Sequence, residues 1–238
     1  MNKIKEFYNK NPKSYDLFES RINEFPLLKE LREKENNLLK HGAGKKVFYF
    51  ATGSGFHITQ LAKAGAKVFT LDFSEEMIKI ACKKLEKEGI EFEVLRGVSS
   101  FSKQFLDEKA GKNPKKLLIA VTDMRKVSLP KNYFDYVFCY CTLPLVGKKN
   151  IESILKKMLE WSRNGAVSIY RKESLPKLKE YYNKAGFNSW INGESIFIEG
   201  GFEYYCANPK EIKGIIEENK KLETIETGLG IIYLWKEK

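Results

Sequence analysis

A turn that contains two glycines, followed by an aspartate, is the feature of this sequence whose residue types and spacing indicate chemistry. The turn is Ala51-Thr52-Gly53-Ser54-Gly55, and Asp72 stands seventeen residues after Gly55. Each follows a short apolar run that is typical of a buried strand. Glycine lets a ligand approach the backbone, and the N–H groups that begin the next helix can bind polar atoms. Because a carboxylate can accept hydrogen bonds from ribose hydroxyls, the spacing predicts a nucleoside-binding crevice at the carboxyl ends of parallel strands.

The third glycine of a dinucleotide-binding turn is missing from this segment. Such turns follow the pattern G-x-G-x-x-G, which would place a glycine at position 58. The sequence has Ile58 there. The turn therefore favours a nucleoside ligand without a pyrophosphate over a dinucleotide.

The segment from Val47 to Lys83, which contains the turn and Asp72, resembles the first two motifs of the class I methyltransferases that use S-adenosylmethionine (SAM). Further on, Asp123-Met124-Arg125 and the run from Pro130 to Val137 resemble the third and fourth motifs of that family, at their usual mutual spacing. The resemblance covers residues 45–171 and, more loosely, the rest of the chain. The residues G-F-H after the turn, with L-x-x-A-G following, are most similar to small-molecule N-methyltransferases of the glycine/sarcosine type.

The resemblance implies SAM as the cofactor and assigns residues to it. The glycines of the turn would pass under the methionine part of SAM, Asp72 would hold the ribose, and Asp123 would contact the adenine. The residues implied to bind SAM are Tyr15, Ala51, Gly53, Ser54, Gly55, Asp72, Phe73, Met77, Asp123, Met124 and Tyr140. Those implied to contact the substrate are Cys141, Thr142 and Tyr204. The catalytic residue is left unassigned, and no metal is expected.

Two residues of the turn region depart from the family pattern. The family usually has Asp or Glu where Tyr49 stands, and Gly where Ala51 stands. The acidic residue normally helps to orient the amino group of SAM. This departure keeps open a second interpretation, in which the chain is a catalytically inactive, methyltransferase-like binding subunit.

His57 and a group of tyrosines are further polar residues near the motifs. We interpret His57 as a residue of the helix start, with a role in the site as the less favoured alternative. An amine acceptor would have to lose a proton, and a nearby tyrosine could accept it. The candidates for this step are Tyr140, Tyr170, Tyr204 and Tyr205.

The favoured acceptor is a small molecule, and an RNA or protein acceptor is the alternative. The formal net charge of +11 could attract nucleic acid. The lysines, however, are spread along the chain and interleaved with glutamates, as in residues 83–88. The sequence also lacks the Asn/Asp-Pro-Pro-Tyr/Phe tetrad of enzymes that methylate amino groups of nucleic acids, and has Cys141-Thr142-Leu143-Pro144 in its place.

The length and composition indicate one globular domain. The chain has 238 residues, of which 42% are hydrophobic, enough for a sizeable core. Its four cysteines have no spacing typical of a disulfide scaffold, which favours a reduced, cytoplasmic setting. We expect no signal peptide, no membrane contact, and either a monomer or a homodimer.

The elements that must position these residues follow from the hydrophobic pattern. Residues 1–44 are expected as a helical cap, 45–171 as the SAM-binding core, 172–207 as an aromatic-rich insertion or lid, and 208–238 as a helix and hairpin. Strands and helices alternate through the core, which predicts an α/β, doubly wound fold. We expect a mostly parallel seven-stranded sheet that ends in a C-terminal antiparallel hairpin strand.

The position of the third strand and the end of one helix are the last two features of this scheme. The third strand is either 90–95, from the spacing after Asp72, or 117–121, from the spacing before Asp135. We favour 117–121, because Asp123 then follows the strand in the place of the adenine contact. We also expect a helix from Ile151 to Trp161, with Asn164-Gly165 just beyond it as the signal that ends it.

Overall fold

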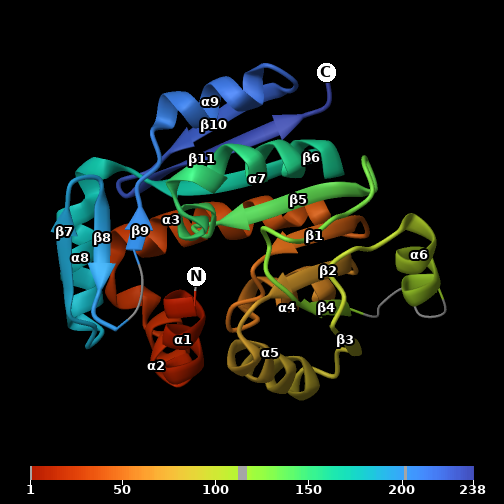
Figure 1. Ribbon diagram of the computed structural model, residues 1–238, viewed down its shortest axis with the longest axis horizontal. Helices are drawn as coiled ribbons and strands as arrows, with labels where there is room; N and C mark the ends of the chain where they lie inside the picture. Colours follow the sequence, from red (N-terminus) through yellow and green to blue (C-terminus); the bar gives the residue numbers. More distant parts are fainter. Residues whose placement is uncertain (1, 112–116, 201–202) are drawn as a thin grey trace.

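A twisted sheet of eight strands forms the centre of the molecule, for which a computed structural model describes residues 2–111, 117–200 and 203–238. The strands are β1 Lys46–Phe50, β2 Lys67–Asp72, β3 Phe92–Arg96, β4 Leu117–Val121, β5 Phe134–Tyr140, β6 Ser162–Tyr170, β10 Lys221–Glu226 and β11 Gly230–Lys236. Their order across the sheet is β10-β11-β6-β5-β1-β2-β4-β3 (Figure 1). The pairs from β3 to β6 are parallel, and β11 runs antiparallel to both of its neighbours, which confirms the predicted terminal hairpin.

Helices cover both faces of this sheet. They are α1 Asn2–Lys10, α2 Pro12–Ser20, α3 Pro26–Leu39, α4 Phe56–Lys63, α5 Glu75–Lys87, α6 Lys103–Gly111, α7 Lys148–Trp161, α8 Leu175–Lys184 and α9 Pro209–Glu217, with short 3₁₀ helices η1 Ile22–Glu24, η2 Lys40–Gly42, η3 Leu143–Val146 and η4 Lys172–Ser174. Side chains alternate along β1, so that Val47 and Tyr49 join one apolar cluster while Phe48 and Phe50 join the other. Helices α3, α4 and α5 pack on the first cluster, and α6, α7 and α9 on the second. Among the described residues, no helix has the length and apolarity that crossing a bilayer requires.

The expectation of seven strands was wrong, because both candidates for the third strand form. The favoured one, β4, pairs with β2, and β3 then adds an eighth strand outside β4. Helix α6 joins the two. The burial of each strand explains its place: the first four residues of β4 are buried, whereas only Leu95 of β3 is. A strand covered on both faces belongs inside the sheet, and a half-exposed one at its edge.

The predicted helix does end at Trp161, but the prediction that Asn164-Gly165 is the signal that ends it was wrong. Helix α7 ends at Trp161, and β6 begins at once with Ser162. A Cβ atom on Gly165 would lie 2.3 Å from Cζ2 of Trp235 and 2.4 Å from the carbonyl oxygen of Val137. The glycine is therefore present because neighbouring strands and an indole ring approach the backbone closely, and it does not end a helix.

Two segments far apart in the sequence close over the carboxyl ends of β1, β2 and β5 (Figure 1). One comprises α1, α2 and α3. The other contains α8 and a small sheet of β7 Ser189–Asn192, β8 Ser195–Ile198 and β9 Glu203–Tyr205. Rings join them: the centroids of Phe7 and Phe187 lie 5.6 Å apart, and those of Phe25 and Tyr181 lie 4.8 Å apart.

The C-terminal hairpin also holds the first of these segments. The carboxylate of Glu30 on α3 accepts a hydrogen bond from the backbone N–H of Gly228, at 3.1 Å, in the turn between β10 and β11. The two segments and the hairpin thus form one wall around the same end of the sheet.

Candidate functional site

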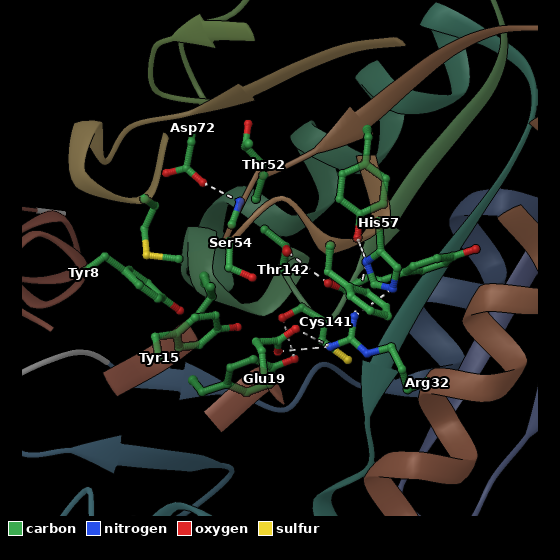
Figure 2. A pocket seen from close by; sticks show the side chains of 18 of the residues that line it. Tyr8, Tyr15, Glu19, Arg32, Thr52, Ser54, His57, Asp72, Cys141 and Thr142 are labelled. Atoms are coloured by element: carbon green, nitrogen blue, oxygen red, sulfur yellow. Dashed lines mark hydrogen bonds and ion pairs between the residues drawn. The ribbon is translucent and has the colours of Figure 1, made fainter. Parts of the chain in front are cut away.

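A pocket opens at the carboxyl ends of β1, β2 and β5, and α1 and α2 contribute to its wall (Figure 2). It gathers every residue that the sequence assigned to SAM or to the substrate, apart from Gly55 and Asp123. Of the candidate proton acceptors, Tyr140, Tyr170 and Tyr204 also line it, whereas Tyr205 does not. Most of the predicted site residues, drawn from distant parts of the chain, therefore lie around one cavity.

The carboxylate of Asp72 is held between two turns at the edge of this pocket. It accepts hydrogen bonds from the backbone N–H groups of Gly53, at 3.0 Å, and of Ser74, at 2.9 Å. Ser74 also begins α5, where its hydroxyl accepts from the N–H of Met77. Burial raises the pKa of Asp72 to about 6, although the hydrogen bonds from the backbone oppose this shift. The carboxylate is thus rigidly placed and can still accept bonds from a ligand.

The two glycines of the turn have different structural roles. A Cβ atom on Gly53 would meet nothing within 4 Å, so this glycine leaves open space beside the turn. A Cβ atom on Gly55 would lie 2.9 Å from both Cα and Cβ of Ala81, so this glycine lets α4 pack on α5. Both have left-handed φ angles, of +52° and +87°. Only Gly53 faces the pocket.

Two residues other than glycine also have left-handed φ angles in the pocket wall. Ala51 follows β1 with φ of +60°, and Cys141 follows β5 with φ of +51°. Such angles cost free energy for residues with a side chain, and they concentrate at functional sites. The carbonyl of Cys141 accepts a hydrogen bond from the hydroxyl of Tyr204, at 3.0 Å, which helps to hold this turn.

Asp123 lies outside the main pocket. Its carboxylate accepts hydrogen bonds from the backbone N–H of Arg125, at 3.0 Å, and from the guanidinium of the same residue, at 2.8 Å. It lines a neighbouring cavity, which it shares with Phe73. Met124, the next residue, reaches the main pocket.

A charged network that the sequence did not reveal closes the other side of the pocket. Nη2 of Arg32, on α3, donates to both carboxylate oxygens of Glu19, on α2, at 3.0 and 3.1 Å. Nη1 of Arg32 donates to Nε2 of His57, at 2.7 Å, and Nδ1 of His57 is hydrogen-bonded to the hydroxyl of Tyr49. Since a guanidinium can only donate, His57 is neutral and carries its proton on Nδ1. Burial and the nearby Arg32 lower the pKa of His57 well below its usual value, which agrees with this state.

A second acid lies behind the pocket wall. The carboxyl of Glu35 accepts a hydrogen bond from Oγ of Ser168, at 2.5 Å, and one from Sγ of Cys141, at 3.7 Å. Nε of Arg32 is 3.8 Å from it. Burial raises the pKa of Glu35, while Arg32 and Ser168 oppose the shift. Cys141 therefore connects the pocket surface to a buried acid.

His57 both begins a helix and takes part in the pocket wall. It is the second residue of α4, as the favoured interpretation expected, and its imidazole also lines the pocket. The sequence does not mark Glu19, Arg32 and Glu35 as site residues. They occur in amphipathic helices, where charged residues usually lie on the solvent-exposed face. Only the packing of α2 and α3 over the pocket brings them there.

The comparisons with known proteins agree with this geometry. A family model described as a methyltransferase domain matches residues 48–169, which is more than half of the chain. The chain is a class I SAM-dependent methyltransferase. No curated protein is similar enough in sequence to match it. The cofactor is SAM. Relatives of this methyltransferase have been crystallised with S-adenosylhomocysteine (SAH), which is what remains of SAM after its methyl group has been transferred.

Solved structures share the fold of this methyltransferase over nearly its whole length. The magnesium protoporphyrin IX methyltransferase of Synechocystis PCC 6803 has 14% identity, a TM-score of 0.63, and 98% coverage of both chains. A SAM-dependent methyltransferase of Clostridium acetobutylicum has 12% identity and a TM-score of 0.58, with 99% of this chain and 98% of that one covered. The N-methyltransferase NodS of Bradyrhizobium japonicum has 11% identity and a TM-score of 0.57, with 94% and 98% covered. The narrower resemblance to the glycine/sarcosine type stays a prediction.

The pocket of this methyltransferase combines polar and aromatic groups. Asp72 has a rigid carboxylate that can accept hydrogen bonds, and the space beside Gly53 is open. Aromatic rings from several elements line the cavity, among them Tyr8, Phe73 and Tyr170, and ring faces attract a positively charged sulfonium.

Proposed function

We propose that this methyltransferase transfers the methyl group of SAM to a small-molecule acceptor, by in-line displacement and without a covalent enzyme intermediate. The observation that supports a small acceptor is the wall of the pocket. Tyr8, Tyr15 and Glu19 from α1 and α2 line it, together with Tyr204 from β9. An acceptor would therefore meet the donor inside a chamber of side chains, with its water displaced.

The charge of the pocket supports the same proposal. The chain has a net charge of +11, but the charged side chains that line the pocket are Glu19, Asp72 and Arg32, with one more acid than base. A phosphate backbone is bound by an excess of lysine and arginine. This cavity instead suits a positively charged donor and an acceptor without phosphate.

Each group of lining residues has a proposed part in the reaction. When bound, SAM supplies a methyl group on a sulfonium that is already reactive, so the protein has to align and enclose the reactants. Asp72 would hold the ribose, and Phe73, Met77 and Met124 would flank the adenine. Asp123, in the neighbouring cavity, is proposed at the adenine edge.

The acceptor would lie beside the turn that follows β5. Cys141, Thr142 and Tyr204 line the pocket there, and Tyr140 precedes them. The hydroxyl of Tyr140 is buried and has no hydrogen-bond partner among the described residues, so it is available to an acceptor atom. Among solved relatives, the Synechocystis enzyme is named for a porphyrin acceptor, which is also a small molecule.

Calorimetry and label transfer test the proposal. Titration of the full chain with SAM and with SAH should show binding of both, and binding of neither would refute a SAM-dependent activity. The enzyme is then incubated with a cell extract and SAM that is tritiated in the methyl group. After unreacted SAM has been separated by chromatography, label should be found in a product that passes a filter retaining macromolecules. Label transferred only to RNA or protein would contradict the small-molecule acceptor.

A further inference from the structure

The pocket has two chemically different ends, with the Gly53 turn between them. At one end the carboxylate of Asp72 lies among apolar side chains such as Phe73 and Met77. At the other end Glu19 and Arg32 bring a full negative and a full positive charge into the cavity wall. Figure 2 shows Asp72 on one side, Arg32 on the opposite side, and Ser54 of the turn between them.

If the adenosine of SAM is bound at the Asp72 end, as the proposed function requires, the rest of the cofactor has to extend over the turn. That remainder is a methionyl chain, which ends in an α-ammonium and an α-carboxylate. A zwitterion of this kind needs an anion and a cation side by side. In the part of the lining that the structure describes, the neighbouring pair of opposite charges is Glu19 and Arg32.

Both members of this pair keep hydrogen-bonding capacity after they have bonded to each other. The carboxylate of Glu19 accepts two bonds from one nitrogen of Arg32, and a carboxylate has about four acceptor positions. Arg32 has five N–H groups: two on Nη2 bond to Glu19, and one on Nη1 bonds to Nε2 of His57. The N–H on Nε lies toward Glu35 at 3.8 Å, which leaves the second N–H of Nη1 unused. The exposed fractions of the two side chains are 15% for Glu19 and 17% for Arg32, so charge-assisted bonds here are little screened by water.

We propose that Glu19 and Arg32 form the subsite for the methionyl zwitterion of SAM, in which Glu19 accepts from the α-ammonium and Arg32 donates to the α-carboxylate. His57 and Tyr49 are positioning residues. His57 accepts a hydrogen bond from the guanidinium of Arg32, and the hydroxyl of Tyr49 holds the imidazole of His57 in place. An acid of α2 then supplies the negative charge that Tyr49, at the end of β1, cannot supply.

Ligands that differ only in the methionyl part test this subsite by calorimetry on the full chain. SAH carries both charged groups, decarboxylated SAM carries only the ammonium, and 5′-methylthioadenosine carries neither. The wild type should bind SAH at least about tenfold more tightly than 5′-methylthioadenosine, because each charge-assisted hydrogen bond adds affinity.

Two substitutions separate the roles of the pair. Glu19→Gln should weaken SAH and decarboxylated SAM by about tenfold each and leave 5′-methylthioadenosine within about twofold. Arg32→Gln should weaken SAH but change the affinity for decarboxylated SAM much less. Glu24→Gln is the matched control, since it makes the same charge change in an exposed ion pair with Arg21, and it should alter none of the three affinities.

The affinity for 5′-methylthioadenosine distinguishes recognition from a structural effect. If Glu19 only held α2 in place, Glu19→Gln would also displace Tyr8 and Tyr15, and all three ligands would weaken equally; that result would overturn the subsite. Equal affinities of the wild type for SAH and 5′-methylthioadenosine would overturn it as well, while leaving the proposed function intact. Absence of any binding by the wild type would refute the proposed function itself.

Discussion

At the scale of single residues, the ionisation of Asp72 makes donor binding depend on pH. Burial raises its pKa to about 6, so the carboxylate of the free protein is ionised at pH 7.5 and mostly protonated at pH 5.0. A protonated acid accepts fewer hydrogen bonds from ribose hydroxyls. We therefore expect the affinity for SAH to fall by about tenfold between pH 7.5 and pH 5.0, measured by calorimetry.

The variant Asp72→Asn checks that this residue causes the pH dependence. It should bind SAH about tenfold more weakly at pH 7.5, since it loses a charge-assisted acceptor, and its affinity should be almost flat down to pH 5.0. A drop of unchanged size in the variant would assign the pH dependence to another group, such as the buried Glu35.

The two glycines of the turn should respond differently to the same substitution. Gly55→Ala places a methyl group 2.9 Å from the backbone of α5 at a φ of +87°, so we expect the free energy of unfolding to fall by ~2–4 kcal/mol. Gly53→Ala meets no atom, and only its left-handed φ should cost about 1 kcal/mol. Urea denaturation measures both, and equal losses would contradict the packing role of Gly55.

At the scale of elements, α1 and α2 should respond to the cofactor more than the edges of the sheet do. They place Tyr8, Tyr15 and Glu19 in the pocket wall, so a ligand that fills the pocket adds contacts to them. Hydrogen exchange followed by mass spectrometry should show slower exchange in residues 2–20 when SAH is bound. Strand β3, at the edge of the sheet opposite the C-terminal hairpin and outside the pocket lining, serves as the internal control, and its exchange rate should not change.

The elements of the core could be predicted from the sequence because their signals are local. Continuous apolar runs such as those of β1, β2 and β5 are signals that act within a few residues. The eighth strand and the role of Gly165 could not be predicted, since both depend on which strand lies beside which. The pair of Glu19 and Arg32 was missed for the same reason: no motif marks a charge that becomes buried only when α2 and α3 fold over the sheet.

At the scale of the whole molecule, the surface charge and the pocket charge should act separately. Lysines on the exterior are screened by salt, whereas the charges around the pocket are largely buried. We expect the affinity for SAH to change less than about threefold between 50 and 500 mM NaCl. Any binding of RNA should decrease steeply over that range, as fluorescence anisotropy can measure.

A competition experiment completes this prediction. Saturating SAH should not displace RNA, since the two would use different parts of the molecule. Displacement of RNA by SAH would instead place nucleic acid at the pocket and contradict the separation.

The joining of α3 to the distant hairpin has a consequence for synthesis on the ribosome. Glu30 and Phe25 leave the ribosome some 150 to 200 residues before their partners Gly228 and Tyr181. The strands that carry Gly53 and Asp72 can pair meanwhile, but the wall that encloses the donor has to wait for residues 181–228. A nascent chain should therefore gain its capacity to hold SAM late, in one step, when translation of the hairpin is complete.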